Sequence, residues 1–194
     1  MSFEQRKVGD IASVTTGLVV KRKQAELPED IIEKYQMLTL KSFDQDRWLN
    51  TAELEMFSAN EILDNKYLTQ EGDVIFRLSH PNTAIMIDKA HVGYLISSLF
   101  AVIRLKTNLL IPDYLNIYLN SDQMKRFYAK GAIGSTIQII KTSMLKDVLV
   151  RFPSLEQQQK LVEVNRLIAK ERELLLQLVA EKAKYHNEII NKLI

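Results

Sequence analysis

Residues 154–194 read SLEQQQKLVEVNRLIAKERELLLQLVAEKAKYHNEIINKLI and contain neither Gly nor Pro. Pro153 precedes the stretch, Ser154 is a suitable N-cap, and Gln157 three residues later completes a capping box. We therefore predict one continuous helix from Ser154 to Ile194. At a rise of about 1.5 Å per residue it would be roughly 60 Å long, about twice the diameter of a domain built from the remaining residues. Such a helix must project from its domain.

Apolar residues recur along this helix at heptad spacing, although Glu171, Lys182 and Lys192 interrupt the track. Packing against the helix's own domain would explain the first turns only, because one domain offers too little surface to cover so long a stripe. We therefore expect a helix from a second copy of the chain, or from another subunit, along the outer half. The track, which also includes Val164, supplies as candidate dimer or partner contacts Leu161, Ile168, Leu175, Leu178, Tyr185 and Ile189.

The length of the chain, 194 residues, allows one domain over residues 1–153 and the helix over residues 154–194. There is no run of about 18 uncharged apolar residues, and the amino terminus is charged where a signal peptide is apolar, so we expect a cytoplasmic protein. The absence of cysteine excludes disulfides, thiolate catalysis and cysteine-ligated metals. Because His80, His91 and His186 are far apart in the sequence, we expect no metal site and no cofactor.

The net charge of +2 hides an uneven distribution. Residues 1–23 carry five basic and two acidic side chains, residues 24–120 carry eight and fourteen, and residues 121–153 carry six and two. Folding can bring the two basic ends together into one face suited to nucleic acid, although solvated loop lysines are an equally good explanation of charge alone.

The apolar pattern of the domain predicts an α+β fold, with a twisted mixed or antiparallel sheet and flanking helices. A helix begins at Pro112 and ends near Gly131, and Lys125, Arg126 and Lys130 near its carboxyl end complement the helix dipole. We place on its buried side Tyr114, Ile117, Tyr118, Met124, Phe127 and Tyr128. The predicted strands cover residues 7–16, 35–40, 73–78, 83–88, 99–106, 137–140 and 148–152, with a helical turn from Thr142.

A search for catalytic motifs favours a binding protein over an enzyme. The chain contains no Walker loop, no GxGxxG, no GxSxG and no HExxH. The segment Gly131-Ala132-Ile133-Gly134 lacks the lysine of a phosphate-binding loop, so a helix C-cap is the better interpretation. A small hydrolase or transferase is therefore disfavoured.

A series of short motifs, taken in order, resembles one target-recognition unit of the specificity (S) subunit of type I restriction-modification systems. The similarity covers the whole chain, and it ends in Pro153, then Glu156-Gln157 at the start of a long helix. The preceding motifs are Lys7-Val8-Gly9-Asp10-Ile11, Gly17, Gly72-Asp73-Val74-Ile75-Phe76 and Gly134-Ser135-Thr136-Ile137.

The resemblance implies a non-catalytic protein whose domain reads one half of a bipartite DNA sequence. Its long helix would act as a coiled-coil-like spacer and as the docking surface for methyltransferase subunits, and through them for the restriction and translocase subunit. Full-length members carry two such units in tandem with their helices packed antiparallel, whereas this chain holds one unit. It therefore resembles a half-length S protein or a fragment of one, and a homodimer would rebuild the full architecture.

Three groups of residues are candidates for DNA contact. Lys21, Arg22 and Lys23 form a basic loop suited to phosphates, with a solvated loop as the alternative. The loop between the predicted strands 73–78 and 83–88 offers donors and acceptors for base edges, with a structural turn as the alternative. This second group contains Arg77, Ser79, His80 and Asn82, and a third group in the glycine-containing segment contains Ser135, Thr136, Gln138 and Lys141.

A second functional interpretation also fits the sequence. The chain would then be a structural adaptor that assembles a complex through its helix without reading DNA. Neutralising residues 21–23 would leave DNA affinity and its salt dependence unchanged in that case.

Overall fold

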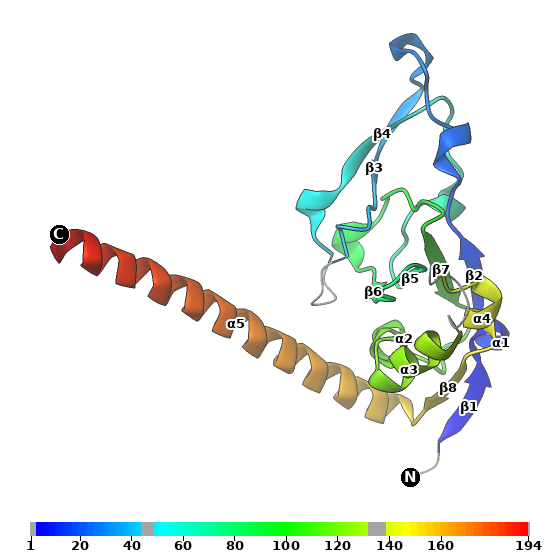
Figure 1. Cartoon of the computed structure of the whole chain (residues 1–194). Helices are drawn as coiled ribbons and strands as arrows, with labels where there is room; N and C mark the ends of the chain where they lie inside the picture. The colour runs from blue at the N-terminus through cyan, green and yellow to red at the C-terminus, as the bar shows by residue number, and fades with distance from the viewer. Residues whose placement is uncertain (1–2, 44–48, 132–138, 194) are drawn as a thin grey trace.

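The computed structural model describes residues 3–43, 49–131 and 139–193. Figure 1 shows a domain from which the last helix, α5, projects far beyond the other elements. The helices are α1 (Val8–Ile11), α2 (Pro112–Leu119), α3 (Asp122–Gly131), α4 (Thr142–Lys146) and α5 (Leu155–Leu193). The strands are β1 (Glu4–Lys7), β2 (Ala12–Thr16), β3 (Glu33–Met37), β4 (Glu55–Ala59), β5 (Val74–Arg77), β6 (Ala84–Met86), β7 (Phe100–Leu105) and β8 (Leu149–Phe152). Short 3₁₀ turns lie at Val20–Arg22, Pro28–Asp30, Thr51–Glu53, Asn65–Tyr67 and Lys89–His91.

A four-stranded antiparallel sheet in the order β2-β7-β5-β6 forms the centre of the domain. Its two inner strands, β5 and β7, are largely buried because both faces of the sheet are covered there. Val74 and Phe76 pack on one side with α2, α3 and β8, whereas Ile75 between them packs on the other side with Leu38 and the residues around it. This explains why β5 is a continuous apolar run and does not alternate with polar residues.

Two smaller sheets extend the domain in opposite directions (Figure 1). The antiparallel pair β1–β8 joins the first strand of the domain to the last, with Glu4 opposite Phe152. The pair β3–β4 stands at the other end, where Tyr35 lies opposite Phe57 over a third apolar cluster. Gly17 connects the central sheet to this end, and a Cβ there would collide with the backbone carbonyl oxygens of Ile96 and Ser97.

Several predicted elements are confirmed, including the long helix, the antiparallel pair β5–β6, strand β7, the turn α4 and strand β8. The strand predicted at 35–40 is shifted toward the amino terminus, because β3 begins at Glu33 and ends at Met37. The strand predicted at 137–140 lies partly outside the described residues. Within it, Ile139 forms an isolated antiparallel bridge with Ser79.

The prediction of one strand over residues 7–16 is wrong, because α1 interrupts it. Val8 and Ile11 are both buried, three positions apart, and a strand would point them to opposite faces. One helical turn places both in the core. The backbone N–H of Val8 then donates to the carbonyl oxygen of Val148 at 2.9 Å.

The prediction of one helix from Pro112 to Gly131 is also wrong, because the helix breaks at Asn120. The buried carboxamide of Asn120 accepts from the N–H of Ala84 at 3.0 Å and donates to the carbonyl oxygen of Ala84 at 2.9 Å, which ties the break to β6. The second helix then turns Phe127 outward, so that this side chain is 38% exposed and not buried as predicted.

Tyr114, Met124 and Tyr128 are buried as predicted, and Ile117 and Tyr118 pack against the same cluster. Burial raises the pKa of Tyr128, whose hydroxyl donates to the carbonyl oxygen of Leu119 at 3.1 Å. This contact joins α3 to the end of α2.

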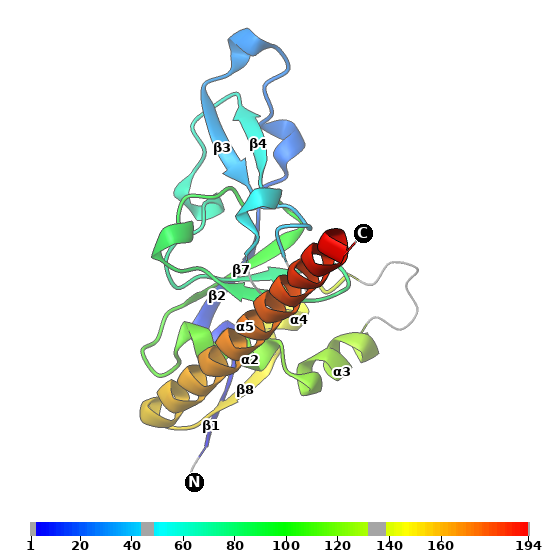
Figure 2. The ribbon, with the colours of Figure 1, turned by 90° about the vertical axis from the view of Figure 1, so that its left-hand side faces the viewer.

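Helix α5 leaves the domain beside α2, as Figure 2 shows from a second direction. Over its length only Gln158 and Val162 are buried, both within its first two turns. The expectation that the domain covers only the start of the helix is therefore confirmed. In the described part of the chain, no helix combines the length and the apolarity needed to cross a membrane.

Candidate nucleic-acid interface

The basic segment Lys21 to Lys23 follows β2 and forms the end of a 3₁₀ turn. Lys23 is partly buried and its ammonium lies 2.8 Å from the carboxylate of Glu61, just after β4. Lys21 and Arg22 are exposed, and neither forms an ion pair with any residue the structure describes. Two of the three predicted cations are thus available to a phosphate backbone, and one is neutralised within the domain.

Arg77 at the end of β5 braces the loop that follows it. Its guanidinium donates to the carbonyl oxygens of Leu40 and His80, both at 3.2 Å, and to the hydroxyl of Ser79 at 3.4 Å. Partial burial lowers the pKa of Arg77, yet an arginine remains protonated at neutral pH. The hydrogen-bond donors of the Arg77 guanidinium are therefore directed at oxygen atoms of the protein itself.

Asn82 also supports the β5–β6 loop from inside, since its amide donates to the carbonyl oxygens of Leu78 at 2.9 Å and Arg77 at 3.3 Å. His80 is exposed at the surface of this loop. Of the four side chains selected here, Arg77 and Asn82 therefore shape the loop, and His80 is the one presented to solvent.

Lys141 is exposed and is the N-cap residue immediately before α4. The segment before it is held beside the β5–β6 loop, because Ile139 bridges Ser79 and the N–H of Ile140 donates to the carbonyl oxygen of Leu78 at 2.9 Å. The other candidates of this group, Ser135, Thr136 and Gln138, lie outside the described residues.

The topology brings two of the candidate groups to one end of the central sheet. Strand β2 ends at Thr16 opposite Ala101, and β5 ends with Arg77 opposite Phe100. The chain that leads to the basic segment and the β5–β6 loop thus both leave the sheet where β7 begins. From there the basic segment continues toward β4, where the N–H of Asn60 donates to the carbonyl oxygen of Lys23 at 3.0 Å.

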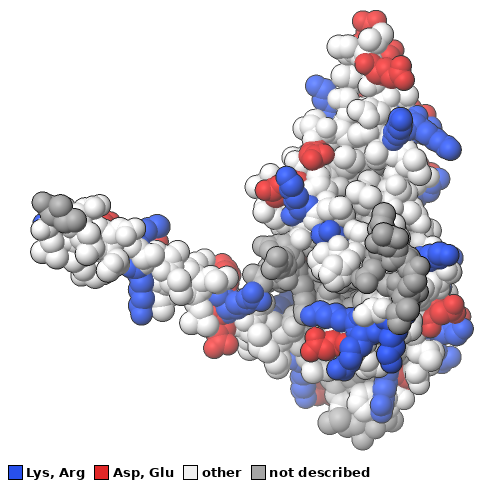
Figure 3. All heavy atoms as spheres, in the orientation of Figure 1, with Lys and Arg blue, Asp and Glu red and all other residues white. Residues whose placement is uncertain are grey.

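Helix α3 carries three basic side chains for which the sequence suggested only a favourable interaction with the helix dipole. Figure 3 shows Lys and Arg side chains gathered over the part of the domain where α3 lies. On α3 itself, Lys125, Arg126 and Lys130 are all exposed, and Lys125 lies 3.4 Å from Asp122. The positive balance of residues 121–153 was the sequence signal for this surface.

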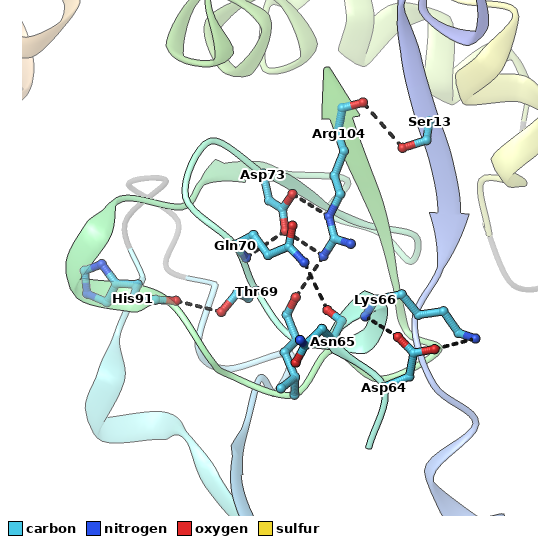
Figure 4. Close-up of polar contacts among 10 residues, drawn as sticks. Ser13, Asp64, Asn65, Lys66, Thr69, Gln70, Asp73, His91 and Arg104 are labelled. Atoms are coloured by element: carbon cyan, nitrogen blue, oxygen red, sulfur yellow. Dashed lines mark hydrogen bonds and ion pairs between the residues drawn. The ribbon is translucent and has the colours of Figure 1, made fainter. Parts of the chain in front are cut away.

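The opposite end of the sheet is held by the ion pair of Arg104 and Asp73 (Figure 4). The guanidinium of Arg104 donates to both carboxylate oxygens, at 2.8 and 3.1 Å, and to the carbonyl oxygen of Leu68 at 2.8 Å. Asp73 also accepts from the N–H of Gln70 at 2.9 Å. Together with the positive φ of Gly72, this gives the Gly-Asp motif a structural role at the start of β5.

Gln158 joins α5 to the domain, and no sequence signal distinguished it from the adjacent glutamines. Its carboxamide oxygen accepts from the N–H of Ile111, and its amide donates to the carbonyl oxygens of Leu109 and Pro153, each at 2.9 Å. The side chain is fully buried. Only the tertiary fold shows which glutamine points into the domain.

The candidate partner contacts on α5 are all exposed in the single chain: Leu161, Ile168, Leu175, Leu178, Tyr185 and Ile189. In the described ranges there is no cluster of three or more His, Asp or Glu side chains able to hold a metal ion. The site is thus a surface of exposed cations on the domain and an apolar face on the helix.

Comparisons with known proteins identify relatives of this fold. Residues 2–171 match the family model described as the type I restriction modification DNA specificity domain. No curated protein sequence is similar enough to count as a match.

Three solved structures are similar over nearly the whole chain. The HsdS subunit from Thermoanaerobacter tengcongensis matches with a TM-score of 0.67 and 17% identity, over 93% of this chain and 46% of that one. A type I restriction-modification S subunit from M. genitalium matches with a TM-score of 0.59 and 14% identity, over 95% and 43%. A chain from a study of complex assembly and conformational transition of a type I system matches with a TM-score of 0.63 and 15% identity, over 93% and 41%. The chain therefore spans less than half the length of each.

Proposed function

The chain belongs to the type I restriction modification DNA specificity domain family, and on that premise we propose that it reads one half of a bipartite DNA sequence for a type I restriction-modification system. The family match over residues 2–171 is the observation that carries this proposal. The chain would have no enzymatic activity of its own and would direct methylation and cleavage by its partners in the cytoplasm.

Residues 1–153 would bind the DNA. Exposed Lys21 and Arg22 suit phosphate contacts, because each neutralised phosphate releases a counterion without requiring a particular base. Lys125, Arg126 and Lys130 of α3 add a second set of exposed cations. We assign base reading to the surface near the β5–β6 loop, where His80 is exposed, and to exposed Lys141. The candidates Ser135, Thr136 and Gln138 keep this assignment from the sequence alone.

Residues 154–194 would act as spacer and assembly surface. The exposed apolar face of α5 supports this role, because a single chain leaves it uncovered. We propose that this face pairs with a second copy of the chain and that the assembled helices dock methyltransferase subunits, which in turn bind the restriction and translocase subunit. Two domains related by a two-fold axis would then read two half-sites separated by a fixed spacing.

Selection from a pool of double-stranded DNA with randomised bases tests the proposal. The chain is used alone and together with the methyltransferase subunits of the same system, and bound DNA is sequenced. We expect enrichment of one short motif, present as two copies at constant spacing. If the methyltransferase subunits bind the chain but no sequence is enriched, the chain is an adaptor and the proposal fails.

A further inference from the structure

A groove of about 330 Å³ lies between α2 and the inner part of α5. Leu161, Val164 and Ile168 form its α5 side, and these side chains are 49%, 52% and 58% exposed. Tyr118 on the α2 side is held by a hydrogen bond from its hydroxyl to the carbonyl oxygen of Leu149 at 2.8 Å. The groove is thus an open apolar trough with one wall fixed by the domain.

The α5 wall of the groove continues as the same heptad track beyond the domain. Leu175, Leu178, Tyr185 and Ile189 lie on this track and are all exposed. The apolar track therefore begins in the groove and extends along the part of α5 that projects from the domain. An occupant that covers both must be long, helical and apolar along one side.

Charged residues interrupt the track at Glu171, Lys182 and Lys192, all exposed. In an antiparallel pair of identical helices, the numbers of the residues that face each other add up to a constant. When Glu171 faces the partner's Lys182, the same constant pairs Leu175 with the partner's Leu178. Every track position from Val164 to Ile189 then meets a residue of its own kind, apolar with apolar and acid with base.

We propose that a second copy of this chain pairs its α5 antiparallel to the first in this one register, so that its outer turns fill the groove. Ile168 then faces the partner's Tyr185, and Val164 faces the partner's Ile189. The aliphatic part of the partner's Lys192 covers Leu161. Each copy completes the groove of the other.

The charges discriminate against the other simple registers. A shift by one heptad in either direction places Glu171 opposite the partner's Leu175 or the partner's Ile189, which buries a carboxylate against an apolar side chain. A parallel pair in register places Glu171 and Lys182 each opposite its own copy, where like charges repel. Of these arrangements, only the proposed antiparallel register places Glu171 and Lys182 opposite residues of opposite charge.

This inference rests on the proposed pairing of two copies and adds its geometry. The two-fold axis passes between Leu176 and Gln177. The two Gln158 side chains, which anchor the helices to their domains, are then about 55 Å apart along the helix axis. That distance becomes the spacer length between the two domains.

Cysteine cross-linking tests the register, because the natural chain contains no cysteine. E171C and K182C are prepared as separate single variants and oxidised alone and as a 1:1 mixture. In the proposed register each cysteine lies about 16 Å from its own copy, beyond the reach of a disulfide, whereas the two different cysteines face each other. We expect a disulfide-linked dimer in the mixture only.

Cross-linking of either variant alone would indicate a parallel pair and would overturn the proposal, and so would the absence of cross-linking in all three samples. DNA selection with the unmodified chain is independent of this result. A monomer that still enriches a sequence would disprove the register and leave the proposed function standing. A cross-linked dimer that enriches no DNA sequence, even with methyltransferase subunits, would support the register and disprove the proposed function.

Charge exchange supplies a second test. E171K places two lysines opposite each other in both halves of the dimer, and K182E likewise places two glutamates, so each should weaken dimerisation about tenfold. The double variant E171K/K182E restores opposite charges and should dimerise as the natural chain does. If dimerisation of the double variant is weakened by as much as the effects of the two single variants combined, the two residues do not face each other and the register is wrong.

Discussion

The carboxamide oxygen of Gln158 accepts a hydrogen bond from the N–H of Ile111 at 2.9 Å, at the residue that precedes α2. The amide of the same side chain donates to the carbonyl oxygens of Leu109 and Pro153. One buried side chain therefore fixes the start of α2, the exit from β8 and the first turn of α5 relative to each other. The direction in which α5 leaves the domain depends on these three contacts.

Replacing Gln158 with alanine should destabilise the chain by about 2–3 kcal/mol, because it leaves three buried or partly buried backbone groups without this hydrogen-bond partner. The free energy of unfolding in urea measures this loss. Q159A is the matched control, because Gln159 is exposed on the same helical turn and its loss should change stability by less than about 0.5 kcal/mol. Equal effects of the two substitutions would contradict the role of Gln158.

Replacing Asp73 with alanine should cost about 2–4 kcal/mol, because it leaves the guanidinium of Arg104 without its carboxylate in a mostly buried site. Thermal unfolding of the purified variant checks this. E181A removes the exposed carboxylate that pairs with Lys184 at 2.6 Å and should have little effect, since exposed ion pairs contribute about 0–1 kcal/mol. A similar shift for both variants would show that burial of the pair is unimportant.

The double variant K21A/R22A should weaken DNA binding and lower the slope of log affinity against log salt concentration by about 2, one for each lost phosphate contact. Fluorescence anisotropy over a range of salt concentrations measures both quantities. K184A removes a cation of α5 that pairs with Glu181, and it should leave the slope unchanged. An unaltered slope for K21A/R22A would remove these residues from the interface.

Neutralising α3 with K125Q, R126Q and K130Q together should lower the same slope by up to about 3 if the helix lies along the DNA backbone. The matched control is K160Q/K170Q/K184Q, which removes three exposed cations from α5 and keeps the domain intact. Circular dichroism confirms that both triple variants are folded. Equal losses of affinity would show that only the total charge matters.

Replacing Leu175 or Leu178 with aspartate should abolish dimerisation, because each change places a carboxylate in the middle of the apolar face of α5. Sedimentation velocity measures the dimer, and thermal unfolding should show an intact domain, since both side chains are exposed and lie beyond the residues of α5 that line the groove. If both variants remain dimeric, α5 does not form the dimer interface.

Strands β5, β6 and β7 of the central sheet could be predicted because each is a short, nearly continuous apolar run, which a sheet covered on both faces requires. The β5–β6 pair and β7 follow directly from that pattern. The break at Asn120 could not be predicted, because its cause is a pair of hydrogen bonds to Ala84, 36 residues earlier in the chain. A helical pattern carries no information about such a distant partner.

For the candidate DNA-contacting residues, too, the sequence predicts one part and the fold decides the other. The cluster Lys21 to Lys23 is visible as consecutive cations, but its partial neutralisation by Glu61 depends on β4 lying alongside. Arg77 and Asn82 have the side chains expected of base contacts, yet in the fold Arg77 donates to the backbone carbonyl of His80 and Asn82 to that of Leu78, both within their own loop. Residue type predicts what a side chain can bind, whereas its neighbours decide whether its donors are free.

The sequence by itself determined the long helix and its apolar track, because helix propensity and heptad spacing are local properties that residues 154–194 carry without help from the rest of the chain. Only the tertiary structure decided where that helix is anchored and which part of its track faces a groove. Gln158 among three consecutive glutamines, and the trough between α2 and Leu161, arise from contacts between segments about 50 residues apart. Such contacts depend on packing in three dimensions, which no local pattern encodes.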